Sequence, residues 1–292
     1  GSEFNGRSFF LQRLNNGGEL ETPRGVKTLT LRSDGNDKYA QIDAIGRAGA
    51  KSGVDPTSPM LRGAMNIALG QLDHREVAYH PRAFRELYHF ILGREPDRLA
   101  ITPEAQPVLE GLVTGFPKGT PTNRPLPDAT VEVFRTDPET GARKGEPIHQ
   151  KITGADGRWG PVTVKPGWTL EFVLTAPGHP ATHIYRSPFL RSTNILHLRP
   201  GRPLDKADQG AAAIVVMSRP RGYFGLPRDV VILDGREPTD IAQGVPIDSS
   251  TTLRLGAQDL DRPIVGQFNE ERIVGRGWLA AEGRIVILEL TS

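Results

Sequence analysis

Two residues that follow predicted strands could perform acid–base chemistry together. Asp37 lies in a turn after the apolar run 26–33, and His74 lies in a loop after the apolar run 64–69. The ends of neighbouring parallel strands meet at one edge of a sheet, so side chains that follow them lie close in space. A carboxylate beside an imidazole holds one tautomer of the ring and stabilises its protonated form. The spacing therefore predicts an acid–histidine pair that activates a hydroxyl nucleophile.

Other residues near these positions have simpler interpretations. Asp34 is nearer the strand end and is the rival acid, and the run from Asp34 to Asp37 is also an ordinary turn sequence whose side chains bind local backbone groups. We interpret Asp73 and Glu76 as loop or helix-start residues. A histidine by itself is more often structural or exposed than catalytic, so the prediction depends on Asp37 and His74 together.

The elements around this pair suggest a mixed helix–strand region. The run Val26–Leu31 is mostly leucine and β-branched, as in a strand buried on both faces. Residues 80–93 predict a helix, with Pro81 in its first turn and Gly93 at its C-terminal cap, and we expect its apolar face to pack on the sheet. A short helix is predicted around Phe9, and a long loop over 41–62.

Three stretches resemble bacterial triacylglycerol lipases of the α/β-hydrolase superfamily. These are Ser-Phe-Phe-Leu-Gln-Arg-Leu-Asn (8–15), Glu-Thr-Pro-Arg-Gly-Val leading into the first strand, and the acid loop from Asp37 to Gln41. The resemblance implies that Asp37 is the triad acid and His74 the triad histidine. Ile42 replaces the proline usual after the acid loop. The chain has no G-x-S-x-G elbow, so the resemblance implies a nucleophilic serine upstream of residue 1, with the oxyanion hole.

Short strands separated by Gly/Pro turns fill the rest of the chain. The segment 127–133 and the turn Thr-Gly-Ala-Asp-Gly-Arg-Trp-Gly (153–160) resemble carboxypeptidase regulatory-like and transthyretin-like sandwiches. Period-two alternation over 107–200 predicts a β-sandwich module. Strand-like runs over 211–292 predict either a second β-rich module or a continuation of the same sheet.

Composition limits the classes of function. The 292 residues carry a net charge of +2, without basic runs interleaved with aromatics, which argues against nucleic-acid binding. Zero cysteines exclude disulfides and thiolate catalysis. The histidines lack metal-ligand spacing, so we expect neither a metal nor a cofactor. Trp159, Trp168 and Trp278 could form an aromatic binding face or lie in the core. No run of about 18 apolar residues predicts an integral membrane segment.

The predicted fold class is α/β plus all-β: a truncated α/β-hydrolase core over 1–96, a β-sandwich module over 107–200 and a second β-rich module over 211–292. The predicted function is a carboxylic ester hydrolase of the lipase/esterase type, acting on a lipid or another ester. Two alternatives remain open: a non-catalytic binding protein that uses its β modules, and a polyester (polyhydroxyalkanoate) depolymerase. The family resemblance implies a secreted or cell-envelope protein. Oligomeric state stays open.

Overall fold

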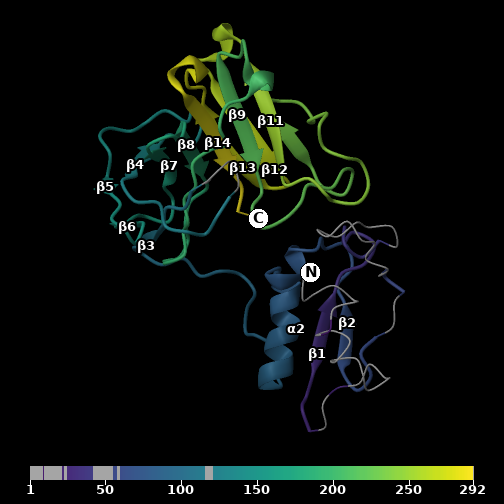
Figure 1. The fold of residues 1–292 in the computed structure, drawn as a ribbon. Helices are drawn as coiled ribbons and strands as arrows, with labels where there is room; N and C mark the ends of the chain where they lie inside the picture. The colour runs from purple at the N-terminus through teal and green to yellow at the C-terminus, as the bar shows by residue number, and fades with distance from the viewer. Residues whose placement is uncertain are drawn as a thin grey trace. The chain divides into compact units, whose positions relative to one another are not determined.

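The computed structural model describes residues 9, 22, 25–41, 55–57, 60–115 and 121–291. The chain divides into two compact units (Figure 1). Unit 1 contains Gly1–Leu99 together with two distant segments, Arg221–Arg228 and Ala242–Ile247. Unit 2 contains Ala100–Pro220, Asp229–Ile241 and Asp248–Ser292.

Unit 1 is built on a pair of short parallel strands. β1 (Leu29–Arg32) pairs with β2 (Met65–Ala68) in the register Leu29↔Met65 to Arg32↔Ala68. Both strands therefore end at the same edge, and the loops carrying Asp37 and His74 leave from it. The 3-10 helix η1 (Glu76–Ala78) and the α-helix α2 (Pro81–Leu92) follow β2. A small core of Leu69, Leu72 and Ala83 joins α2 to the strands.

The predicted helix over 80–93 is confirmed as α2, including both of its ends. The His80 side chain accepts a hydrogen bond from the N–H of Arg82, and Pro81 occupies the first turn, where a missing N–H costs nothing. Gly93 ends the helix with φ at 69°, a left-handed conformation that glycine adopts without strain. Its packing differs from the expectation. Ala83 is the buried residue of α2, whereas Phe84, Leu87, Ile91 and Leu92 are exposed.

Unit 2 is dominated by a seven-stranded mixed sheet with the order β11-β9-β14-β8-β7-β4-β5 (Figure 1). The strand β14 lies inside this sheet and pairs in parallel with both β8 and β9. The sheet therefore joins the segments 107–200 and 211–292, which is the continuation left open by the sequence. Its strands are β4 (Thr130–Thr136), β5 (His149–Ile152), β7 (Thr169–Thr175), β8 (Ala181–Arg186), β9 (Ala213–Ser218), β11 (Ser250–Leu255) and β14 (Arg284–Glu289).

Two smaller sheets cover opposite faces of this large sheet. One is the antiparallel pair β3 (Val108–Leu112) and β6 (Arg158–Thr163). The other is the three-stranded sheet of β10 (Val231–Leu233), β12 (Pro263–Phe268) and β13 (Glu271–Arg276). Trp159 of β6 packs against Phe172, whereas Gly275 of β13 lies against Tyr185. Phe172 pairs with Ile184, the neighbour of Tyr185 in β8, and successive strand residues point to opposite faces.

The sandwich core of unit 2 lies under the β3–β6 pair and comes almost entirely from the predicted module 107–200. It contains the fully or nearly buried side chains Leu109, Val113, Val131, Val133, Trp159, Leu170, Phe172, Leu174, Ile184 and Leu198. The turn before Trp159 depends on Gly157, because its φ is 65° and an added Cβ would lie 2.9 Å from the carbonyl oxygen of Val113. The Trp159 indole donates a hydrogen bond of 2.9 Å to the carbonyl of Leu196.

The predicted fold class, a truncated α/β-hydrolase core followed by two β modules, is wrong. The described residues contain fourteen strands and one α-helix with complete bounds, and the fold is mostly β and sandwich-like. The β1–β2 sheet has two strands of four residues, and all residues of β1 are only partly buried. The run 26–33 is therefore not a strand covered on both faces. Apart from Phe9 itself, the short helix predicted at the N-terminus lies outside the described residues, as does most of the loop predicted over 41–62.

Candidate functional site

Asp37 and His74 meet at the common end of β1 and β2. The Nδ1 atom of His74 lies 2.9 Å from Oδ2 of Asp37, which is hydrogen-bonding distance. The other carboxylate oxygen of Asp37 accepts the N–H of Tyr39 at 2.8 Å. The structure thus brings together Asp37 and His74, the predicted pair, and it places Asp37 rather than the rival acid Asp34 against the imidazole.

The imidazole of His74 is held from one side and open on the other. The Tyr39 ring lies against it edge-on, with 4.6 Å between ring centroids. The His74 side chain is 48% exposed and that of Asp37 is 16% exposed. With Nδ1 used by the carboxylate, Nε2 is the nitrogen left to exchange a proton with a reacting group. An imidazole in this state can act as a general base, and the carboxylate stabilises the resulting imidazolium.

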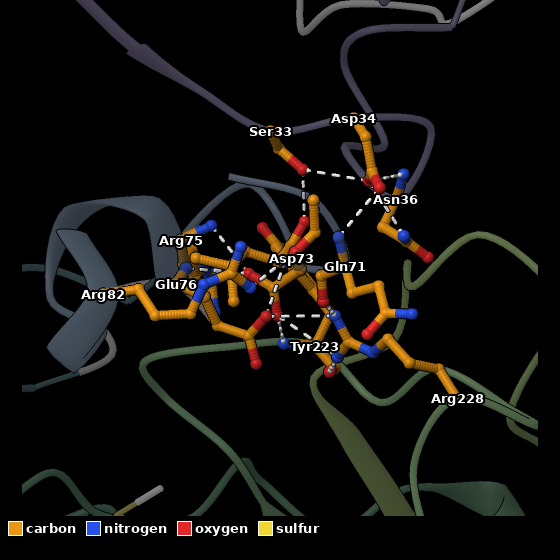
Figure 2. Close-up of polar contacts among 12 residues, drawn as sticks. Ser33, Asp34, Asn36, Gln71, Asp73, Arg75, Glu76, Arg82, Tyr223 and Arg228 are labelled. Atoms are coloured by element: carbon orange, nitrogen blue, oxygen red, sulfur yellow. Dashed lines mark hydrogen bonds and ion pairs between the residues drawn. The ribbon is translucent and has the colours of Figure 1, made fainter. Parts of the chain in front are cut away.

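Asp34 has a different task, because it connects the acid loop to the histidine loop. Its Oδ1 accepts the backbone and side-chain N–H groups of Asn36, and its Oδ2 accepts the N–H of Gln71 at 2.8 Å (Figure 2). Burial raises the pKa of Asp34, but these hydrogen bonds outweigh burial and hold the pKa below its ordinary value of 3.8. Asp34 therefore stays ionised as a tether between the loops.

Ser33 also links the two loops. Its hydroxyl donates to the carbonyl of Leu72, and the side chain is buried. A hydroxyl committed to a backbone carbonyl and shielded from solvent is poorly placed to attack a substrate. Ser33 is therefore a structural residue of this site.

Asp73 and Glu76, which flank His74, start the helix η1 as the sequence indicated. The Oδ1 atom of Asp73 accepts the N–H groups of Arg75 at 2.7 Å and Glu76 at 3.0 Å. The Oε2 atom of Glu76 accepts the N–H of Asp73 at 2.6 Å. This reciprocal pattern has the hydrogen bonds of a capping box, with Asp73 two residues before Arg75, the N-cap residue of η1. His74 lies inside the box, so the box restricts its backbone.

Two residues of this site, Tyr223 and Arg228, were not predicted from the sequence. They belong to the segment Arg221–Arg228 of unit 1 and contact the histidine loop about 150 residues away along the chain (Figure 2). No motif or spacing in the sequence connects them with Asp73 or Glu76. Only the assembled unit reveals their proximity.

The other histidines and the tryptophans are placed elsewhere. His80 caps α2, His89 pairs with Glu95 on the exposed side of that helix, and His183 is buried in unit 2. Trp159 is buried in the core, against which Trp168 packs. In the part of the chain that the structure describes, no group of three or more His, Cys, Asp or Glu side chains could hold a metal ion. Among the same residues, no helix combines the length and apolar character needed to cross a bilayer.

Comparison with known proteins supports a relationship to lipases. Residues 106–203 match the family described as Lipase C-terminal domain. This range contains β3 to β8, the strands around the sandwich core of unit 2. No curated protein matches the chain.

Solved structures show only distant likeness. The dioxygenase domain of a dioxygenase–carbohydrate-binding protein fusion from Streptomyces sp. SirexAA-E is 20% identical; the match covers 35% of this chain and 84% of that one, with a TM-score of 0.21. The shaft pilin SpaA of Lactobacillus rhamnosus GG is 9% identical; the match covers 66% of this chain and 99% of that one, with a TM-score of 0.24.

Proposed function

We propose that this protein is a carboxylic ester hydrolase of the lipase/esterase type, in which Asp37 and His74 are the acid and the base. The observation that carries the proposal is the 2.9 Å contact between Oδ2 of Asp37 and Nδ1 of His74, beside an exposed ring. The match of residues 106–203 to the lipase C-terminal family supports the same class of reaction.

The chemistry follows from the two nitrogen atoms of the imidazole. Nδ1–H of His74 donates to Asp37, so Nε2 carries the lone pair that accepts the proton of a serine hydroxyl. The serine oxygen attacks the ester carbonyl, and the imidazolium returns its proton to the departing alcohol. Water then attacks the acyl-enzyme by the same base catalysis. We propose that the serine and the oxyanion-hole donors come from a part of the protein outside these 292 residues.

The test is hydrolysis of nitrophenyl esters of graded acyl length by the full-length gene product. We expect His74→Gln to lower kcat by at least about 10⁴-fold, because no base remains to activate the hydroxyl. We expect Asp37→Asn to lower kcat by about 10³–10⁴-fold, because the imidazole loses its preferred tautomer. The matched control is His89→Gln, which removes an exposed histidine of α2.

A fluorophosphonate probe supplies a second readout. It should label a serine of the full-length protein, more slowly in His74→Gln than in the wild type. Esterase activity that persists unchanged in His74→Gln would overturn the proposal. Activity that also survives in Asp37→Asn would show that the two residues form a structural pair only.

A further inference from the structure

The segment 221–228 is fastened to the capping box that contains His74. Asp73 is completely buried, and its Oδ2 accepts the N–H of Tyr223 at 2.6 Å. Its Oδ1 accepts the N–H groups of Arg75 and Glu76 within the box. One carboxylate therefore joins the histidine loop to a segment about 150 residues away, and Figure 2 shows it at the centre of the polar cluster.

Arg228 makes the second connection between the same segments. Its Nη1 donates to Oε2 of Glu76 at 3.0 Å and to the carbonyl of Gln71 at 3.0 Å. Its Nη2 reaches the carbonyl of Tyr223 at 3.4 Å. The Arg228 side chain is 15% exposed, so solvent screens these contacts only in part. The guanidinium thus holds both the start and the end of the loop on which His74 lies.

The Tyr223 ring contacts the neighbours of both members of the proposed pair. Lys38, which follows Asp37, places Nζ 4.1 Å from the ring centroid. Arg75, which follows His74, places its guanidinium carbon 4.3 Å from the same centroid. Lys38 also donates to the carbonyl of Ile247, in the second distant segment of unit 1. The quadrupole of an aromatic ring attracts cations over its face. The Tyr223 ring therefore contacts both loops, the acid loop through Lys38 and the histidine loop through Arg75.

We infer that Tyr223 and Arg228 are positioning residues for the Asp37–His74 pair. This inference rests on the proposed function for its kinetic consequence, but not for its structural one. Asp37 and His74 lie on two loops that leave the β1–β2 pair, which has four residues in each strand. The contacts of Tyr223 and Arg228 connect these loops beyond the ends of the paired strands and so fix their positions relative to each other.

The structural consequence can be measured on the 292-residue chain without a nucleophile. Ring ¹⁵N chemical shifts report which nitrogen of a neutral histidine carries the proton. In the wild type we expect His74 to be held as the Nδ1–H tautomer by Asp37. We expect Arg228→Gln and Tyr223→Leu to give a mixture of tautomers, and Tyr223→Phe, which keeps the ring, to resemble the wild type. The matched control Arg94→Gln removes an exposed arginine of the same unit.

The kinetic consequence is measured on the full-length gene product. If the variants displace His74 from Asp37, kcat should fall by about 10-fold to 100-fold with little change in KM. A displacement of about 1 Å is sufficient for a fall of this size. We expect Arg228→Lys to recover part of this loss, since it keeps the charge, and Arg94→Gln to keep wild-type rates.

Failure of the positioning role can be distinguished from failure of the proposed function. If Arg228→Gln and Tyr223→Leu keep the wild-type tautomer of His74, the positioning role is wrong whatever the kinetics. If the tautomer becomes mixed but His74→Gln leaves ester hydrolysis unchanged, the positioning role stands and the proposed function fails. If either variant unfolds unit 1, the conservative variants decide. A partial shift towards mixed tautomers in Arg228→Lys supports the inference, and wild-type tautomers in both Arg228→Lys and Tyr223→Phe overturn it.

Discussion

Replacing Glu171 by glutamine should strongly destabilise unit 2, because this carboxylate is fully buried between two nitrogen groups. Its Oε2 lies 2.6 Å from Nε of Arg143, and its Oε1 lies 2.7 Å from Nδ1 of His183. The His183 ring stacks on Trp278 at 4.1 Å between centroids. Burial raises the pKa of Glu171, but the bonds from His183 and Arg143 outweigh it and hold the pKa below its ordinary value of 4.5.

The magnitude follows from what a glutamine side chain cannot replace in Glu171→Gln. Its amide oxygen could still accept from Arg143, but its NH₂ group would face Nδ1–H of His183. To relieve that clash the proton would have to move to Nε2, which is buried without a hydrogen-bond partner among the described residues. Breaking a buried ion pair by removing one partner costs about 3–5 kcal/mol. Because Arg143 is 30% exposed, we expect the lower end, about 3 kcal/mol.

The assay is reversible unfolding followed by tryptophan fluorescence and calorimetry. A loss of about 3 kcal/mol lowers Tm by about 6–12 °C in a unit of this size. The matched control Glu146→Gln makes the same chemical change at an exposed loop position and should leave Tm within about 2 °C. Equal Tm values for the two variants would refute the energetic role assigned to the Glu171 cluster.

Three further outcomes follow from unit 2. Burial lowers the pKa of His183 below 6.5, despite the opposing effect of Glu171. Because folding lowers the pKa of both His183 and Glu171, each group stabilises the folded state less as the pH falls. The contribution of His183 should decline below pH 6.5 and that of Glu171 below pH 4.5. A flat profile of Tm against pH between pH 7 and 4 would contradict this. Gly111→Ala should lower the free energy of unfolding by at least about 1–3 kcal/mol, because the added Cβ would lie 2.0 Å from the backbone oxygen of Leu196. A wild-type Tm for this variant would exclude the clash. The segment 107–200 expressed alone should unfold cooperatively, because it contains nearly all of the sandwich core. It should also self-associate, because the loss of β14 leaves the edge of β8 unpaired. A non-cooperative unfolding transition would show that the segment is not an independent domain.

The features that the sequence could predict are those encoded by neighbouring residues. Pro81 and Gly93 set the ends of α2 through their own backbone preferences, and strands predicted within 107–200 are present, among them β4 and β7. The pairing of Asp37 with His74 was also predictable, since it needs only two adjacent parallel strands that end together. Asp34 and Asp37 could be ranked only by resemblance, and the structure separates them by their hydrogen-bond partners.

The features that escaped prediction depend on residues far apart in the chain. Burial of a given side of α2 depends on which residues of unit 1 pack beside it, which periodicity does not encode. The same holds for β14, whose six residues give no sign that they pair in parallel with both β8 and β9. Tyr223 and Arg228 are the clearest case. A hydrogen bond between segments 150 residues apart produces no motif or spacing from which the contact could be predicted. The sequence alone thus determined which residues could form an acid–histidine pair, and the tertiary structure decided which distant segment holds that pair in register, since such contacts arise only when the chain closes on itself.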